Sequence, residues 1–565
     1  ERRLFEEALE QIEVADRAGF DVVWFVEHHF MEEYSHSSAP EVVLAAASQR
    51  TSRIRLGHGI VQLPPDVNHP ARIAERIASL DIVSGGRVEF GTGESSSAAE
   101  LGGFGVRRTD KRAMWEDAIE GITRMFVEEP FAGWESPYWR MPPRNVVPKP
   151  VQKPHPPLWV ACSRRETIHF AATKGIGALS FSFVEPEDAG KWVKEYYDIL
   201  GSDECVPAGF SVNPNVTVVL PMMCHEDEQT AIERGIDGTH FFGFALAHYY
   251  GVTPHAPGLT SVWEEFLARR HDQGFSRDII LADDAPLAVK IMQHGLGSMR
   301  GAVGTPEQIA ELCRRYEAVG VDQVGFALQA GKNKHEDICE SLELFGKAVM
   351  PEFAGRRDEQ ERIKAERLAP AIERALARRT PARRAPAVYM IDEEAEVERA
   401  RRSQRKVSLR PRTLVREGVR EARSTIRRRG SHALGRWAGG KTDEQIEKRF
   451  ASRIVQRGLY TAMAASFNPK MAFGFEGEIQ HELRFPATGG ETAVWTIEVA
   501  GSKASARPGP ARSPAVTLQV GAASLVRLAA GDNPAVVLME GQLDVKGDIG
   551  VAMRLPEMFG GASPY

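Results

Sequence analysis

The chain has 565 residues and a hydrophobic fraction of 42%, so it is long enough for two folded units of ordinary globular composition. Its formal net charge of -6 gives no general indication of a nucleic acid or an anionic membrane as a partner. No apolar stretch is long enough to span a bilayer and no signal peptide is recognisable, so we expect a cytoplasmic protein without stable membrane insertion.

The cysteines are scattered, odd in number and free of any C-x-x-C spacing. This pattern indicates a reducing compartment and argues against both a disulfide framework and structural zinc, so we predict no metal site. The five cysteines are Cys162, Cys205, Cys224, Cys313 and Cys339.

Helical and strand-like segments alternate over residues 1–355. Apolar residues recur at helical spacing from Leu4 to Ala15, Gly19 is placed to end that helix, and the apolar run DVVWFVE follows. Repetition of this unit favours a parallel sheet with helical crossovers. The length suits a (β/α)8 TIM barrel better than a doubly wound sheet, because no G-x-G-x-x-G follows the early strands.

Over residues 356–440 the composition changes, with basic clusters such as RARRSQRK and few large apolar residues. Charge runs are usually solvated, so we interpret the segment as an Arg-rich, partly helical linker. The alternative is docking to an acidic surface, either the companion domain or anionic lipid. Nucleic acid is not supported, because no aromatic residues are interleaved with the basic ones.

A second domain is expected over residues 441–565. Thr442 and Gln445 have the spacing of a capping box at the start of an amphipathic helix. In GEIQHELRF the pattern changes to period two, and similar strands follow it, separated by Gly- and Pro-rich turns. One face of that strand carries Ile479, His481, Leu483 and Phe485. This pattern predicts a small α+β domain with an apolar interior and no obvious catalytic set.

Glu27, His28 and His29 follow the first expected strand. In a β/α barrel the active site lies at the carboxyl ends of the strands, so these residues are candidates by position. Successive side chains on a strand point in opposite directions, so the two histidines would not face one small centre, and no metal-binding partner motif is evident. We interpret His28 as a proton-handling imidazole, with a structural pair and a metal site as the alternatives.

Two later strand ends are further candidates. In RVEFGTGESSS, Gly91 and Gly93 would let a flat ligand approach the backbone, although glycines at strand ends are common in any fold. In WVACSRRET, Ser163 has Glu166 three residues on, the spacing of a capped helix start. Such a helix start is either structural or a phosphate site with added arginine donors. GTPEQ has the same signals without the arginines, and we interpret it as structural.

Residues 1–355 resemble the bacterial-luciferase-like family of flavin-dependent monooxygenases, which are (β/α)8 barrels. The motifs that carry the resemblance are AGFDVVWFVEHHF, NHPARIAERIASLDIVSGGRVEFGTG, ACSRRET and VGTPEQ. The combination of EHHF with SGGR-x-x-FGTG makes it fairly specific. The resemblance implies reduced FMN as cofactor and O2 as co-substrate. In that family a strand precedes the first helix, so we expect either that the first barrel strand is missing from this chain or that the barrel closes unusually.

The resemblance also implies roles for individual residues. His28 corresponds to the family's histidine that lies beside the flavin and handles protons, and His29 is expected to assist or orient it. A non-proline cis peptide under the flavin ring is expected near Gly59–Ile60, and the FMN phosphate is expected on the turn from Ser163 to Thr167. The implied cofactor contacts are Gly59, Ile60, Gly93, Ser95, Ser163, Arg164, Arg165 and Thr167.

The chain departs from luciferase itself at two places. Gly93 and Glu94 stand where luciferase has a reactive Cys followed by an Arg, and Cys162 stands where luciferase has a Glu. Arg164 or Arg165 would then supply the phosphate-binding charge. The family also contains deazaflavin-dependent dehydrogenases, although EHH fits the FMN branch better.

Residues 441–565 resemble the sterol-carrier-protein type 2 family, through FNPKMAFGFEGEIQHEL, VWTIEV, LVRLAAGDNPAVVLMEG and GQLDVKGD. In that family a helix-covered sheet encloses an apolar tunnel for acyl chains, sterols or isoprenoids; the alternative is that the same residues only form a core. The expected substrate contacts are Phe25 in the barrel and Phe475, Trp495, Leu518, Met539 and Met553 in the carrier domain.

Together the two resemblances imply a two-component monooxygenase. Reduced FMN, supplied by a separate NAD(P)H-dependent flavin reductase, would react with O2 to give a C4a-peroxyflavin that oxygenates a lipid-, sterol- or terpenoid-like substrate. The carrier domain would raise the substrate's local concentration near the barrel. The alternatives are a deazaflavin-dependent hydride-transfer oxidoreductase and a non-catalytic lipid-binding protein. Because luciferase-like barrels often pair, we expect a homodimer.

Overall fold

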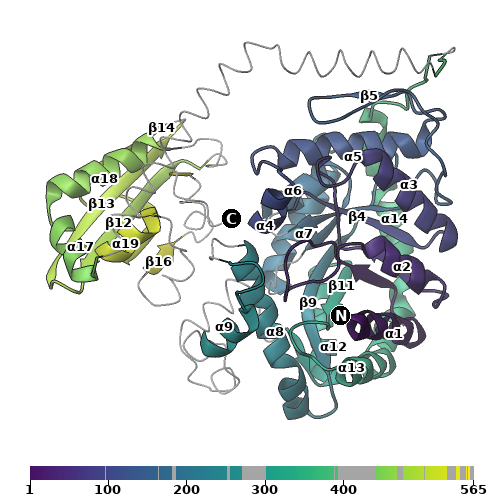
Figure 1. Ribbon diagram of the computed structural model, residues 1–565, viewed down its shortest axis with the longest axis horizontal. Coiled ribbons are helices and arrows are strands. Elements are labelled where there is room, and N and C mark those ends of the chain that lie inside the picture. Colours follow the sequence, from purple (N-terminus) through teal and green to yellow (C-terminus); the bar gives the residue numbers. More distant parts are fainter. Residues whose placement is uncertain are drawn as a thin grey trace. The chain divides into compact units, whose positions relative to one another are not determined.

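The computed structural model describes residues 1–95, 97–162, 165–180, 186–250, 255–269, 301–386, 389–391, 441–467, 472, 475–501, 503–530, 543–547, 555 and 558–559. The chain divides into two compact units (Figure 1). The first comprises Glu1–Tyr249 and Ala256–Tyr389, and the second comprises Tyr250–His255 and Met390–Tyr565. No helix within the described ranges is long and apolar enough to cross a membrane.

A parallel sheet forms the centre of the first unit. Its hydrogen-bonded path runs through β1 (Val22–Phe25), β2 (Arg55–His58), β4 (Val88–Gly93), β7 (Leu158–Cys162), β8 (Gly177–Ser180), β9 (Val216–Cys224) and β10 (Ala302–Gly304). In addition, β3 (Val61–Gln62) pairs with β4, and β11 (Gln323–Ala327) pairs with β9. A separate antiparallel pair joins β5 (Trp134–Glu135) to β6 (Arg140–Met141).

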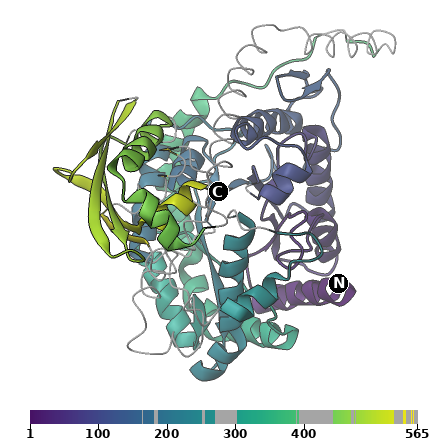
Figure 2. The same ribbon diagram turned by 60° about the vertical axis from the view of Figure 1, so that its left-hand side comes forward.

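Helices connect successive strands and surround the sheet (Figures 1 and 2). They are α1 (Arg2–Ala18), α2 (Pro40–Ser48), α3 (Pro70–Val83), α4 (Ala98–Gly103), α5 (Lys111–Val127), α6 (Arg165–Thr173), α7 (Pro186–Leu200), α8 (Glu228–Tyr250), α9 (Val262–Arg269), α12 (Pro306–Ala318), α13 (His335–Ala348) and α14 (Met350–Arg378). Gly19 ends α1 with a left-handed φ of 101°, as its position after the apolar repeat predicts. Thr305 forms a capping box with Gln308 at the start of α12, which agrees with the structural interpretation of GTPEQ.

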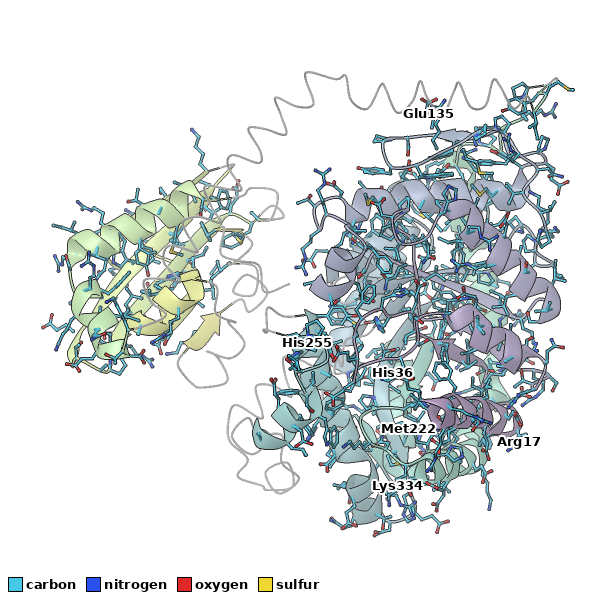
Figure 3. All side chains as sticks on the ribbon, viewed as in Figure 1. Arg17, His36, Glu135, Met222, His255 and Lys334 are labelled. Carbon is cyan, nitrogen blue, oxygen red and sulfur yellow. The ribbon has the colours of Figure 1, made fainter. Side chains whose placement is uncertain are left out.

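Burial follows the pattern expected of parallel strands covered by helices. Strand β4 is buried along its whole length, and β9 is buried at nearly every position. Side chains fill the space between strands and helices, as at Met222 on β9, which is 1% exposed (Figure 3). The predicted α/β architecture with a barrel-type parallel sheet is confirmed. In the part of the chain that the structure describes, no hydrogen-bonded pairing joins β1 to β11.

The start of the segment expected as a linker, residue 356, lies inside α14, which packs against the first unit as far as Arg378. Arg356 pairs with Glu317 at 2.5 Å and Lys364 pairs with Asp322 at 2.7 Å. Leu368 and Ala375, seven residues apart, are buried. Basic residues in this stretch therefore bind acidic groups of the first unit, while residues 392–440 lie outside the described residues.

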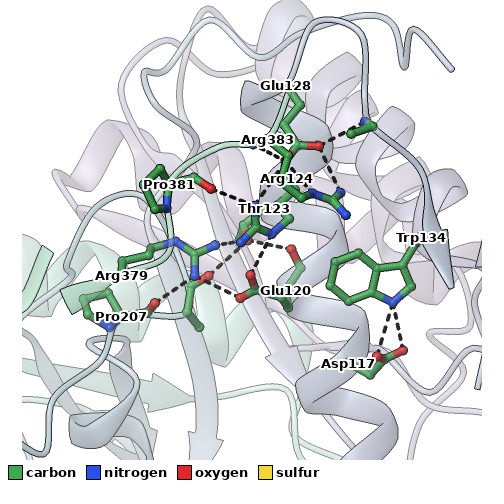
Figure 4. A network of polar contacts seen from close by, with 12 residues as sticks. Asp117, Glu120, Thr123, Arg124, Glu128, Trp134, Pro207, Arg379, Pro381 and Arg383 are labelled. Atoms are coloured by element: carbon green, nitrogen blue, oxygen red, sulfur yellow. Dashed lines mark hydrogen bonds and ion pairs between the residues drawn. The ribbon is translucent and has the colours of Figure 1, made fainter. Parts of the chain in front are cut away.

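The chain after α14 is fastened to the end of α5 by a polar network (Figure 4). The Glu128 carboxylate is fully buried and accepts hydrogen bonds from Arg124 at 3.2 Å and from Arg383 Nε at 3.0 Å. Arg379 donates to Glu120 at 2.9 Å and to the Pro207 carbonyl at 3.0 Å. These contacts fix the path of residues 379–383 over the first unit.

The second unit is an α+β domain, as predicted. Its strands β12 (Gly477–Phe485), β13 (Gly490–Ala500), β14 (Lys503–Pro508), β15 (Pro514–Gly521) and β16 (Leu543–Gly547) form a sheet in the order β14-β13-β12-β15-β16. Its helices are α17 (Asp443–Phe450), α18 (Arg453–Ala465) and α19 (Ala522–Ala530). The Thr442–Gln445 capping box is present, and the β12 side chains predicted to share an apolar face are all buried.

Candidate active site

The ends of three neighbouring strands carry the cluster of polar side chains. Glu27, His28 and His29 follow β1, Gln62 ends β3, and Ser95 follows β4. These strands lie together because β1 pairs with β2, and both β2 and β3 pair with β4. The carboxyl-end position expected for an active site is therefore the position at which the polar residues meet.

Glu100, at the start of α4, is the centre of this cluster. Its Oε1 atom lies 3.2 Å from His28 Nδ1 and accepts hydrogen bonds from the His29 backbone N–H at 3.0 Å and from Gln62 Nε2 at 2.6 Å. Its Oε2 atom accepts from the Ser95 hydroxyl at 2.8 Å. Burial disfavours the charged form, but the hydrogen bonds from His28, Ser95 and the His29 backbone outweigh it and hold the pKa of Glu100 below its usual value.

The ionised state of Glu100 fixes the tautomer of His28. A carboxylate only accepts hydrogen bonds, so Nδ1 of His28 carries the proton that it shares with Glu100. When the imidazole is neutral, Nε2 is consequently its basic nitrogen. The pair has the geometry of an imidazole that is oriented by a buried acid, as in many proton-transferring sites.

His29 has a different carboxylate partner. Its Nε2 lies 3.0 Å from Glu27 Oε1, which also accepts from Asn68 Nδ2 at 2.8 Å. The two histidines thus diverge, as the alternation of side chains along the chain predicts. Within the described residues, no group of three or more His, Cys, Asp or Glu side chains is arranged to hold a metal ion.

Aromatic rings surround both imidazoles. Tyr34 is partly buried and its ring meets that of His28 edge-on, with 5.2 Å between the ring centroids; desolvation raises the pKa of its phenol above the usual range. The ring of Phe104 meets that of His29 edge-on, with 4.9 Å between the ring centroids, and the ring centroids of Phe30 and Phe104 are 5.2 Å apart. The side chains of His28 and His29 are 15% and 17% exposed, so both imidazoles are mostly enclosed but remain accessible.

Backbone strain is concentrated in the same two loops. Among the described non-glycine residues, the left-handed φ values belong to Phe30 (62°), Glu32 (28°) and Ser95 (59°). Phe30 and Glu32 follow the histidine pair, and Ser95 binds Glu100 directly. Such conformations are costly and persist where surrounding contacts enforce them, which they do most often at functional sites.

The residues present fit a flavin ring next to His28. Oε1 of Gln62 is a buried acceptor without a hydrogen-bond partner among the described residues, and a reduced flavin offers ring N–H donors. The Ile60 side chain packs against Gly93, with Cδ1 only 2.5 Å from the ideal Cβ position, so any side chain at residue 93 would displace Ile60. The prediction of a non-proline cis peptide near Gly59–Ile60 is wrong, because each cis peptide bond within the described residues precedes a proline.

The expected phosphate turn is described only in part. Ser163 and Arg164 lie outside the described residues, as does the side chain of Arg165, the first residue of α6. Burial raises the pKa of the neighbouring Cys162 thiol to about 12, partly offset by Thr167 and Arg112. Cys162 is therefore a neutral core residue rather than a nucleophile.

Two basic residues at the start of α5 lie near this turn and were not identified from the sequence. Arg112 binds Glu94 at 2.6 Å and stacks over Phe170 of α6 at 4.1 Å. Lys111 donates to the Ser95 carbonyl at 2.7 Å. Lys111 also lies 3.6 Å from Glu94, so this one carboxylate pairs with both basic residues.

Glu100, Gln62 and Asn68 were also missed by the sequence analysis. The available signal was SAAE at residues 97–100, which has capping-box spacing. Ser97 does cap α4, but the Glu100 carboxylate bonds to His28 instead of returning to the cap residue. A capping-box glutamate with another partner is recognisable only in three dimensions.

The expected substrate contacts are distributed over both units. Phe25 ends β1 and is partly buried against the core of the first unit. In the second unit Trp495 and Leu518 are core residues and Phe475 packs against that core. Met539 and Met553 lie outside the described residues.

Comparisons with known families agree with the division into two units. A family model described as Luciferase-like monooxygenase matches residues 3–323. A second model, described as SCP-2 sterol transfer family, matches residues 476–560. The first match covers the whole His28 cluster, and the second covers the sheet of the second unit.

Individual relatives are each similar to part of the chain. Uncharacterized protein y4wF of Sinorhizobium fredii is 34% identical over 221 residues, which are 39% of this chain and 62%, slightly under two thirds, of that protein. The oxygenase component of the flavin-dependent trigonelline monooxygenase of Acinetobacter baylyi is 24% identical over 358 residues, 63% of this chain and 91% of that protein. The crystal structure of monooxygenase RslO1 from Streptomyces bottropensis is 27% identical, with a TM-score of 0.49 over 62% of this chain and 93% of that one.

Proposed function

Because the chain belongs to the luciferase-like monooxygenase family and also carries an SCP-2 sterol transfer domain, we propose that it uses reduced FMN and O2 to oxygenate a hydrophobic substrate. The observation that carries the proposal is the His28–Glu100 pair, which lies at the carboxyl ends of the strands among aromatic rings and strained backbone. The flavin, when bound, would supply the electrons that activate O2 for transfer of one oxygen atom.

We assign proton transfer to His28. Glu100 holds Nδ1, so Nε2 is the nitrogen that would take up or release a proton during the oxygen reaction. His29 and Glu27 form the second layer, which keeps the loop after β1 in place through Asn68. Tyr34 and Phe104 would exclude water, which otherwise diverts activated oxygen to hydrogen peroxide.

Flavin contacts come from both sides of this cluster. Gln62 Oε1 would accept from a ring N–H, and Gly59, Ile60, Gly93 and Ser95 would supply backbone near the ring. The start of α6, with Arg165 and Thr167, would hold the phosphate, because a helix N-terminus presents N–H groups to an anion. Ser163 and Arg164 belong to the same proposed turn, and Arg112 and Lys111 would add positive charge.

The source of reduced FMN would be a separate protein. The trigonelline monooxygenase relative is named as an oxygenase component, which supports a two-component system in this chain also. We therefore propose an NAD(P)H-dependent flavin reductase as the partner. Residues 1–355 would carry the oxygenase, and residues 441–565 would carry the substrate-binding domain.

The experiment is the oxidation of bound reduced FMN after anaerobic mixing and admission of O2. His28→Asn should leave reduced-FMN affinity within about threefold of wild type and slow the oxygen reaction by about 10²-fold, the usual contribution of a positioned acid–base group. Absorbance of the flavin follows the reaction, and an assay for hydrogen peroxide measures uncoupling.

His36→Asn is the matched control, because His36 is exposed in the same loop and pairs only loosely with Glu1 at 3.6 Å. It should behave as wild type. Equal oxidation rates in the wild type, His28→Asn and His36→Asn would remove His28 from the chemistry.

A further inference from the structure

The interior of the second unit contains a polar group where the strand pattern calls for an apolar one. His481 lies on the buried face of β12, the middle strand, between Ile479 and Leu483, both 0% exposed. Across the sheet it stands beside Trp495 on β13 and Leu518 on β15. The ring is 2% exposed, and burial lowers its pKa to about 4, so it is neutral at neutral pH.

One nitrogen of this ring is bonded to α18. His481 Nδ1 lies 3.0 Å from the Tyr460 hydroxyl, which is itself 0% exposed. Within the described residues, the Tyr460 hydroxyl makes no other hydrogen bond. Burial raises the pKa of this hydroxyl well above its usual value. A buried O–H must donate, so Tyr460 donates to Nδ1, and the proton of the neutral imidazole is then on Nε2.

Neighbouring polar groups are satisfied, which makes the exception informative. Trp495 stacks on Tyr460 at 4.6 Å and donates from Nε1 to Gln456 Oε1 at 2.9 Å. Gln456 in turn donates to the Phe450 carbonyl at 2.8 Å. His481 Nε2 is buried without a hydrogen-bond partner among the described residues. A buried N–H without a partner is costly, so its presence in a strand of Ile and Leu indicates a partner that arrives with a ligand.

We propose that the interior of this domain recognises an uncharged oxygen atom of an apolar ligand through the Nε2–H of His481. The ligand class is a long apolar molecule bearing a ketone, ester or hydroxyl oxygen, which accepts a hydrogen bond from a neutral imidazole. A purely hydrocarbon ligand would leave the donor without a partner, and a carboxylate would lose its hydration without gaining a cation. The inference rests on the proposed role of this unit as carrier of a hydrophobic substrate, and it does not depend on the flavin chemistry.

The test compares two probes that differ in one oxygen atom, 2-tridecanone and tridecane. Each displaces diphenylhexatriene from the full-length protein, and fluorescence reports its affinity. The wild type should prefer the ketone by about fivefold beyond the difference in their partitioning into hexadecane, the usual worth of one net hydrogen bond. His481→Leu should bind tridecane at least as well as wild type and lose the preference.

Two further variants separate the hydrogen bond from general packing. His481→Gln retains a side-chain N–H donor and should keep part of the preference. Tyr460→Phe removes the O–H that sets the tautomer and should weaken the preference while Trp495 remains stacked. Circular dichroism and thermal unfolding check that each variant is folded.

Several outcomes would overturn the inference: equal preference in wild type and His481→Leu, tighter His481-dependent binding of tridecanoate than of the ketone, or binding of neither probe. The last would also end the carrier role. Reduced-FMN titration of the same samples reports the barrel separately, so a failure of the flavin proposal is distinguishable from a failure of this one.

Discussion

A buried carboxylate that accepts several hydrogen bonds holds each of its donors in place, and Glu100 holds groups from three segments of the chain at once. It binds His28 and the His29 backbone after β1, Gln62 at the end of β3, and Ser95 after β4. In a largely apolar surrounding such charge-assisted bonds are stronger than in water. The orientation of His28 therefore depends on a residue that need not touch the flavin or the substrate.

Glu100→Gln tests this positioning role. The amide keeps the shape but loses the charge and two acceptor sites, so His28 loses its fixed tautomer. We expect turnover to fall by about 10- to 100-fold with reduced-FMN affinity within about threefold of wild type. Stopped-flow oxidation of bound reduced FMN over a range of pH measures both the rate and its pH profile.

Glu89→Gln is the matched control, because Glu89 is a buried carboxylate on β4 that binds Trp159 Nε1 at 2.6 Å rather than His28. It should lower stability without changing turnover per folded molecule. If Glu100→Gln leaves both rate and pH profile unchanged, Glu100 does not position His28.

Three buried histidines predict acid sensitivity. Burial lowers the pKa of His58, His155 and His481 to about 4, from an ordinary value of 6.5. Between these pH values the unfolded chain binds more protons than the folded one, so the free energy of unfolding falls as the pH decreases from about 6.5 to about 4. Each histidine contributes on the order of 3 kcal/mol over that window.

Hydrogen exchange of β4 and β12 amides, measured in urea at about pH 7.5 and about pH 5, would give the decrease in the free energy of unfolding of each unit. His481→Leu should remove the loss from β12 and leave it in β4. Equal stability at the two pH values would contradict the assignment of neutral buried histidines.

At this scale the sequence predicts the histidines but not their partners. EHH at a strand end is a local pattern, and the separate directions of His28 and His29 follow from side-chain alternation. Glu100 is 72 residues away from His28, and its local pattern indicates only a helix cap. The packing of Ile60 against Gly93 was not predicted either, because it is a tertiary contact that no local sequence pattern indicates.

At the scale of elements, α14 and the residues after it belong to the first unit by their contacts. Leu368 and Ala375 give the helix a narrow apolar stripe among many charged residues. Composition alone favours a solvated linker, because the acidic partners Glu317 and Asp322 lie on other elements. The strands and most helices of both units, by contrast, follow from periodicity and capping signals that are local.

Glu128 is the residue on which this attachment depends most. Glu128→Ala would leave Arg124, whose side chain is 4% exposed, buried beside Arg383 without their shared carboxylate. We expect the free energy of unfolding to fall by about 3 kcal/mol, the usual cost of breaking a buried ion pair. Urea unfolding measures it, with Glu129→Ala, at an exposed neighbouring position, as the control.

Loss of less than about 1 kcal/mol in Glu128→Ala would show that the network in Figure 4 contributes no more than surface ion pairs do. A comparable loss in Glu129→Ala would attribute the effect to the helix end rather than to the carboxylate.

At the scale of the whole molecule, one chain joins a unit of the luciferase-like monooxygenase family to a domain that matches the SCP-2 sterol transfer family. Tethering raises the effective concentration of a bound ligand if both sites can be reached. Insertion of a protease site within residues 392–440 tests this. At low concentrations of an apolar substrate, cleavage should lower turnover by about tenfold or more, while oxidation of bound reduced FMN without substrate stays unchanged.

An insertion without cleavage is the control for that experiment, because it lengthens the tether while keeping the covalent link. Unchanged turnover after complete cleavage would show that the carrier domain does not deliver substrate to the barrel of its own chain.

The organisation into two units was predictable from the sequence, since each unit has its own hydrophobic periodicity. Neither pattern identifies the substrate.

The most direct measurement of the central claim is a pair of anaerobic titrations, one with reduced FMN and one with the reduced deazaflavin, followed by admission of O2. The account predicts preferential binding of reduced FMN, oxygen uptake coupled to oxidation of the bound flavin, and slowing in His28→Asn. Preference for the deazaflavin without oxygen uptake would contradict it and indicate hydride transfer. Binding of neither cofactor would indicate a lipid-binding protein whose barrel is catalytically inactive.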